Sequence, residues 1–283
     1  YEDGTVIDLR KNLDIMGAAL DRQFPDALPG AGYRTFIEYS RRMYRLSEKV
    51  FFYKDVGGVL DMMRSNKPND PGLLREVMAM RMHSTVGATV HKHIAEPHVR
   101  QIAEHFLQYV GSSPFLAPAI LTLIAAAQVD HGCCYAMAPE GGGGRDGGTR
   151  MVARTLSRIA DELGVEKVLG LGVRRIRHDG SRAVGVELDD GRTIDADVVV
   201  SNCDVQRTLR DLVGSPAARA RQGRIARKYT PACSGVVLYL GLDRQYDHLA
   251  HHNFLFSADS RAEFDDIYGD GVPARDPTLY LAA

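Results

Sequence analysis

The chain has 283 residues, of which 45% are hydrophobic, and this is enough apolar material for one large domain or two ordinary ones. Its 35 basic residues nearly balance its 36 acidic residues, and no block of one sign stands out, so we expect neither a nucleic-acid partner nor an acidic tail. Four cysteines without a C-x-x-C pair indicate a reducing compartment, and the adjacent Cys133 and Cys134 are not expected to form a disulfide with each other.

The start of the chain carries no recognisable targeting segment. The first residues, YEDGTVIDLR, contain no Met, no basic stretch and no apolar stretch, so we expect no signal peptide and interpret the start as truncated. The longest uncharged run, residues 111–129, contains Ser, Pro, Thr and Gln, whereas a membrane span needs about 20 predominantly apolar residues. This run predicts a buried or interfacial helix in a cytoplasmic protein.

The first half of the chain has mainly helical periodicity. A short alternating stretch at residues 4–9 predicts a strand. After it, apolar side chains recur at spacings of three and four, which is typical of amphipathic helices separated by Pro and Gly residues. The predicted helices cover residues 11–24, 32–52, 72–82, 92–109 and 113–129.

The second half changes from helical to strand periodicity. Residues 150–163 predict an amphipathic helix, and Gly164 suits the position after its C-terminus because glycine readily adopts a positive φ. Alternating or β-branched stretches then predict a β-meander over residues 165–202, with tight turns at Asp179-Gly180 and Asp190-Gly191. The remaining predicted elements are a short helix over residues 205–213 and an apolar strand over residues 233–242.

Four segments of the second half resemble a known family. They are GGTRMVARTLSRIADELG, GVRRI, AVGVELDDGRTIDADVVVSNCD and SGVVLYLGLDRQYDHLAHHNFLFS, in this order between residues 147 and 257. Together they resemble the phytoene desaturase family of FAD-dependent carotenoid desaturases, within the amine-oxidase-like flavoprotein group. The stretch DGRTIDADVVVSN has a pattern shared by many flavin oxidoreductases, whereas the HHN run at residues 251–253 is more specific to carotenoid desaturases.

The resemblance implies a fold and a reaction. The fold is α/β, with a helical substrate-binding layer, a mixed or antiparallel sheet and an incomplete Rossmann-like FAD domain. Residues 1–145 would bind substrate, residues 146–232 would form part of the FAD-binding domain, and residues 233–283 would return to the substrate region. The implied reaction is desaturation, in which a hydride and a proton leave adjacent carbons of a polyene hydrocarbon and FAD accepts the hydride.

Residue roles follow from the same resemblance. The implied FAD contacts are Val173, through its backbone, and Ser201 and Asn202, at the end of a strand beside the cofactor. The implied substrate contacts are Phe115, Leu116, Ile120, Leu123, His251 and His252. The apolar residues near Phe115 also predict peripheral contact with a membrane, where polyenes dissolve. No pattern identifies a catalytic acid or base, and ordinary core or strand packing would explain the same residues.

The chain departs from the family pattern in its glycine-rich segments. The family's G-x-G-x-x-G between a strand and a helix is not found in that context, and its C-terminal flavin-contacting segment is not recognised either. The stretch GGGGRDGGT at residues 141–149 follows no predicted strand, and extra residues separate Tyr135 from Gly147-Gly148. We therefore interpret residues 141–146 as a flexible insert rather than as a phosphate-binding loop.

Several alternatives stay open. A related flavin oxidase acting on an amine or a porphyrinogen would share much of the pattern, and a polar pocket lining would favour it. Another alternative is a non-catalytic protein that binds a hydrophobic ligand or a partner and has lost its flavin half. No metal site is expected, because helical geometry points the clustered histidines to different faces; they are His91, His93, His98 and His105.

Overall fold

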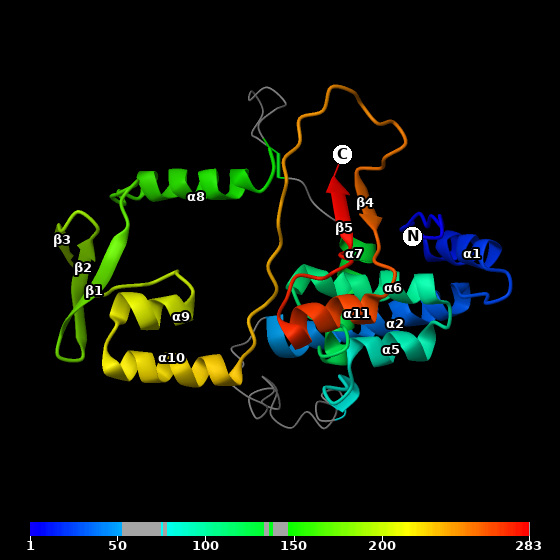
Figure 1. The fold of residues 1–283 in the computed structure, drawn as a ribbon, viewed down its shortest axis with the longest axis horizontal. Helices are drawn as coiled ribbons and strands as arrows, with labels where there is room; N and C mark the ends of the chain where they lie inside the picture. The colour runs from blue at the N-terminus through cyan, green and yellow to red at the C-terminus, as the bar shows by residue number, and fades with distance from the viewer. Residues whose placement is uncertain (53–74, 76–77, 133–135, 138–146, 283) are drawn as a thin grey trace. The chain divides into compact units, whose positions relative to one another are not determined.

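The computed structural model describes residues 1–52, 75, 78–132, 136–137 and 147–282. The chain packs as two units (Figure 1): unit 1 contains residues 1–133 and 232–283, and unit 2 contains residues 134–231. Within the described ranges, no helix combines the length and the apolar character that a membrane span needs. The assignment of functions to residues 1–145, 146–232 and 233–283 stays a prediction.

Unit 1 is mainly helical. Its helical elements are α1 (Leu13–Gln23), α2 (Gly30–Ser47) with a π turn (Glu48–Phe52), α5 (Val86–His93), α6 (Pro97–His105) with a 3₁₀ turn (Phe106–Val110), a 3₁₀ turn (Ala119–Thr122) leading into α7 (Leu123–His131), and α11 (Ser260–Asp265) with a π turn (Asp266–Asp270). The helices predicted over residues 11–24 and 32–52 are confirmed as α1 and α2, whereas the one over residues 72–82 is described only at residues 75 and 78–82, of which 75, 78 and 79 are helical.

The single helix predicted over residues 92–109 is wrong, because the chain breaks it in two. Helix α5 ends at His93, and α6 begins at Pro97, which lacks the N–H that a continuing helix requires but suits a first turn. The Glu96 carboxylate caps α6 by accepting a hydrogen bond from the Val99 amide at 2.7 Å. The helix predicted over residues 113–129 also begins later, after Pro118, which has an extended backbone.

The core of unit 1 lies among α1, α2, α5, α6 and α7. Helix α2 contributes Tyr33, Phe36 and Ile37, whose spacing places them on one face. The other main members of this buried cluster are Met16, Leu20, Val86, Val90, Ile94, Val99, Ile102, Phe106 and Leu107. A smaller cluster of Met43, Leu46, Met80 and Ile120 extends the apolar interior along the C-terminal half of α2.

Unit 1 also contains a short antiparallel hairpin that the sequence patterns did not predict. Strand β4 (His252–Leu255) pairs with β5 (Leu279–Ala282), and Phe254 lies opposite Tyr280. Figure 1 shows α11 between these strands in the chain, so the hairpin closes over a long helical connection.

The described part of unit 2 contains a small meander and four helical elements. They are α8 (Arg150–Glu162), the sheet β1 (Val173–Asp179), β2 (Arg182–Leu188) and β3 (Thr193–Asp195), then α9 (Val205–Arg207), a π turn (Thr208–Val213) and α10 (Pro216–Lys228). The predicted turns are confirmed, since Gly180 and Gly191 have φ of 59° and 86°. The antiparallel sheet is confirmed as well, whereas the incomplete Rossmann-like FAD domain stays a prediction.

Four stretches with strand-like patterns do not form strands. They are residues 4–9, 165–169, 197–202 and 233–242, and the predictions for them are wrong. A strand is stabilised by ladder hydrogen bonds to a neighbour, and no described segment pairs with these four. Most of their apolar side chains are exposed, as at Val200 (88%) and Val236 (91%), whereas Ile7 is half-buried against the core of unit 1. The apolar face of α8, which includes Leu156, is exposed too.

Candidate functional site

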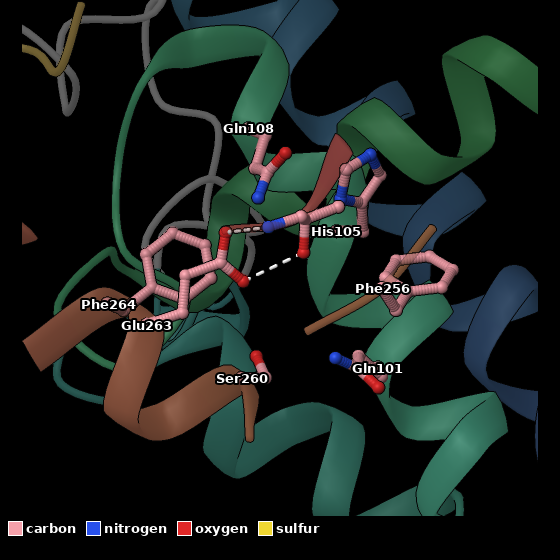
Figure 2. A pocket seen from close by; sticks show the side chains of 8 residues that line it. Gln101, His105, Gln108, Phe256, Ser260, Glu263 and Phe264 are labelled. Carbon is pink, nitrogen blue, oxygen red and sulfur yellow. Dashed lines mark hydrogen bonds between the residues drawn. The ribbon is translucent and has the colours of Figure 1, made fainter. Parts of the chain in front are cut away.

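A pocket in unit 1 lies between α6 and α11 (Figure 2). Its lining residues are Gln101, His105, Gln108, Phe256, Ser260, Glu263, Phe264 and Thr278. Although polar groups surround it, the pocket is a packing gap that is too narrow to admit a water molecule. Its lining residues therefore pack the C-terminal segment of unit 1 against α6.

The buried carboxylate of Glu263 organises one side of this pocket. Its oxygens accept hydrogen bonds from the Ser257 hydroxyl at 2.7 Å, the Thr278 amide at 2.9 Å and the Thr278 hydroxyl at 2.8 Å. Figure 2 draws two hydrogen bonds at the Glu263 carboxylate as dashed lines. Gln101 of α6 donates to the Ser257 carbonyl at 2.8 Å. Three donors satisfy the charge, which makes its burial tolerable, and the network ties residues 257–278 to α6.

His105 occupies the apolar side of the same pocket. Its ring meets Phe254 and Phe256 edge-on, with centroids 4.3 Å and 5.1 Å away. Burial among these groups disfavours the charged imidazolium and lowers the pKa of His105 to about 4. The side chain is therefore neutral near pH 7, and it is a half-buried aromatic contact rather than a charged group.

The other histidines that the sequence singled out pair with carboxylates or rings. His91 shares a hydrogen bond with the buried Glu104 at 2.9 Å, and burial raises the pKa of that carboxyl although the hydrogen bond to His91 opposes the rise. His98 lies between Glu96 and Asp3, at 2.8 and 3.0 Å. Among the described residues, no group of three His, Cys, Asp or Glu side chains is arranged to hold a metal ion.

An aromatic row follows the hairpin β4–β5, and two of the predicted substrate residues stand at its end. We define the aromatic row as His252, Phe254, Phe256 and Tyr280. The Tyr280 ring stacks on Phe254 at 4.9 Å and on His252 at 5.8 Å, and the Tyr280 hydroxyl shares a 2.5 Å hydrogen bond with His252 Nδ1. His251 lies beside His252, with ring centroids 4.4 Å apart. Both histidines are exposed, so a ligand can reach this end of the row.

The four predicted substrate residues near Phe115 are not brought together. Phe115 packs against Phe264 with centroids 6.2 Å apart, and the Arg261 guanidinium lies 4.7 Å from the Phe115 ring centroid. Leu116 is 69% exposed, whereas Ile120 is 4% exposed within the smaller core cluster, against which Leu123 packs. Ordinary packing accounts for Ile120 and Leu123, and no channel joins the four among the described residues.

The predicted FAD contacts lie in unit 2. Val173 begins β1 opposite Leu188 and is 41% exposed. Ser201 shares a 2.8 Å hydrogen bond with the Thr208 hydroxyl, and Asn202 is exposed. Neither Ser201 nor Asn202 lies in a strand, so the strand predicted to end at these two residues is wrong. The three positions are accessible to a flavin, but no phosphate-binding loop accompanies them among the described residues, so they would supply only part of a flavin site.

Several predicted features lie outside the described residues. They are Cys133, Cys134, Tyr135 and the glycine-rich residues 141–146. Gly148 is described and has a φ of 85°, and it leads into α8 as the sequence pattern predicts.

Comparisons with known proteins find similarity over nearly the whole chain. The family model for flavin containing amine oxidoreductases matches residues 8–278. A 4,4'-diapolycopene oxygenase from Methylomonas sp. is 34% identical over 283 residues, which are 100% of this chain and 53% of that protein. A 4,4'-diaponeurosporene oxygenase from Staphylococcus haemolyticus is 34% identical over 281 residues, covering 99% and 52%, and one from Staphylococcus aureus is 31% identical over 284 residues, covering 99% and 53%. The chain thus spans about half the length of these curated relatives.

Proposed function

The chain belongs to the flavin-containing amine oxidoreductase family, and we propose that it forms part of an FAD-dependent enzyme that oxidises a linear carotenoid. The observation that carries this proposal is the similarity, along the full chain, to proteins named as 4,4'-diapolycopene and 4,4'-diaponeurosporene oxygenases. The HHN run that resembles carotenoid desaturases supports the same class of substrate.

The names of these relatives favour introduction of oxygen over the desaturation expected from the sequence resemblance. Both reactions are oxidations of the polyene, for which a bound flavin supplies the redox chemistry. This chain's own residues would position the substrate. The stacked rings of the aromatic row offer π faces to a conjugated chain, and His251 and His252 stand at its exposed end. Val173, Ser201 and Asn202 are the proposed flavin contacts.

A polar pocket lining would favour an amine or porphyrinogen oxidase, and a second pocket of unit 1, of about 400 Å³, has one; it is lined by Tyr1, Glu2, Asp3, Pro97, His98, Gln101, Ser257 and Ala258. The pocket in Figure 2 is polar as well. That pocket is too narrow for either substrate, so its polarity reflects the network around Glu263 and not a binding preference. A carotenoid substrate remains the better supported proposal.

The test is carotenoid retention and conversion by the chain. We expect the chain purified from a host that accumulates 4,4'-diapolycopene to retain pigment, and Tyr280→Ala to retain several-fold less than Leu279→Ala, its neighbour on the opposite face of β5. Mass spectrometry of the host's pigments then separates a product that has gained oxygen from one that has only lost hydrogen. Equal failure of the chain and both variants to retain any carotenoid would refute the proposed substrate.

A further inference from the structure

Helix α10 carries a strongly basic surface that the sequence alone did not show. The stretch 205–229 contains seven basic residues and one acidic residue, in a chain whose formal net charge is −1. No long run of consecutive charges marks it, which is why the sequence pattern predicted no single-sign block. Folding into a helix gathers the charges.

The five cations of α10 share the outer side of the helix. Ala218 is buried and Gln222 and Ile225 are half-buried, and Gln222 donates to the Gln206 side chain of α9 at 2.9 Å, so this side faces the rest of unit 2. Helical geometry turns the basic residues away from that side. We call them the basic face: Arg219, Arg221, Arg224, Arg227 and Lys228, all exposed.

The basic face has little countercharge: its Arg219 attracts the Asp211 carboxylate, which is already paired with Arg210. Helix α10 contains no Asp or Glu, and none of its five cations forms an ion pair with another residue of the described part of the chain. The arginines of β1 differ: Arg175 pairs with Glu187 at 2.5 Å, and Arg177 pairs with Asp195 at 2.5 Å. An unneutralised cluster beside neutralised ones indicates an anionic partner for α10 in particular.

We propose that the basic face of α10 binds the anionic headgroups of a lipid bilayer. The choice of lipid rests on the proposed function, because a linear carotenoid dissolves in bilayers and its enzyme must reach them. The end of the helix supports it: Tyr229 follows the last turn, is 58% exposed, and has the Lys228 ammonium 5.2 Å from its ring centroid. Tyrosine beside a basic residue is typical of membrane interfaces. A nucleic-acid track is less well supported, since the β1 arginines that would extend it are paired.

This surface is a different one from the membrane contact expected near Phe115, which stays a prediction. There, Phe115 packs against α11 and Ile120 is buried, so neither forms an apolar surface for lipid. The contact proposed for α10 is electrostatic, and it brings the chain to the bilayer surface without inserting a helix.

The test is co-sedimentation of the full chain with vesicles, without carotenoid or flavin. We expect binding to vesicles of phosphatidylglycerol and phosphatidylcholine but not to phosphatidylcholine alone, and weakening as salt rises. The triple variant R221Q/R224Q/R227Q should bind about 100-fold more weakly, since each cation near an anionic surface contributes about a fivefold factor. The control R158Q/R182Q/R192Q removes three exposed arginines elsewhere in unit 2 and should bind within about twofold of the original chain.

The outcomes separate this inference from the proposed function. Equal binding by both triple variants, equal binding to neutral vesicles, or tighter binding of single-stranded DNA than of vesicles at the same salt would overturn the lipid surface. Loss of carotenoid retention with vesicle binding intact would instead count against the proposed substrate alone. Circular dichroism checks that both variants keep their helix content, as glutamine in place of arginine predicts.

Discussion

His105 should make the protein less stable as the pH falls from about 6.5 to about 4. Burial lowers its pKa from 6.5 to about 4, so the folded chain resists protonation that the unfolded chain accepts below pH 6.5. Above pH 6.5 the side chain is neutral in both states and contributes no pH dependence. The difference of about 2.5 units, at about 1.4 kcal/mol per unit, corresponds to about 3 kcal/mol of unfolding free energy lost by pH 4.

The variant that isolates this effect is His105→Phe, because the ring at this position packs edge-on against Phe254 and Phe256 and phenylalanine preserves the aromatic contact. Urea unfolding followed by circular dichroism between pH 7.5 and pH 4 would give the unfolding free energy at each pH. His248→Phe is the control, since this side chain is exposed. His93, whose pKa is also lowered by burial, contributes equally to all three proteins and cancels in the comparison.

We expect His105→Phe to remove about 3 kcal/mol of the loss in unfolding free energy between pH 6.5 and pH 4. His248→Phe should leave that loss unchanged. An unchanged slope in His105→Phe would mean that the imidazole is solvated in solution, and the packing of α6 against the aromatic row would then be wrong.

Three further predictions concern packing. Glu263→Ala should cost about 2–4 kcal/mol of unfolding free energy in urea titrations, because it leaves the buried donors of the network unpaired, while Glu263→Gln should cost less than half as much. Gly185→Ala should cost about 2–4 kcal/mol, since its φ is 147° and a Cβ would lie 2.1 Å from the Ile194 carbonyl oxygen; Gly180→Ala, with open space around it, should cost about 1 kcal/mol. Ile120→Ala should lower the thermal midpoint by several degrees, whereas Leu116→Ala should leave it within about one degree, and the reverse order would contradict their burial.

Local signals in the sequence were sufficient for most helices and for the meander. Asp179-Gly180 and Asp190-Gly191 predicted turns because glycine tolerates the positive φ they require, and the structure confirms both. Gly164 was recognised after α8 for the same reason. The break before α6 was missed although Glu96-Pro97 carries its signal, an N-cap acceptor followed by proline. Helical periodicity on both sides concealed it.

The features that matter for the candidate site depend on long-range contacts, which no local pattern encodes. In the sequence Glu263 has the pattern of an ordinary helix residue. Only in the fold does its buried carboxylate accept hydrogen bonds from Ser257 and Thr278. Phe254 faces Tyr280, which lies 26 positions further along the chain, so the aromatic row exists only after the hairpin closes. The basic face of α10 was overlooked in a different way, because its charges are spaced along the sequence and become neighbours only on the helix.

The stretches 197–202 and 233–242 show the opposite case, in which a local pattern predicts an element that the structure does not form. Their β-branched and alternating residues have the composition of strands, yet the structure forms no strand from them and leaves most of their apolar side chains exposed. A strand pattern specifies which side chains are suited to burial, but ladder hydrogen bonds require a second segment, and the pattern does not say where that segment lies. The expected placement of Ser201 and Asn202 at a strand end depended on such a partner. Their role at a flavin is therefore tested by cofactor binding to Asn202→Ala, where an affinity equal to that of the original chain would contradict it.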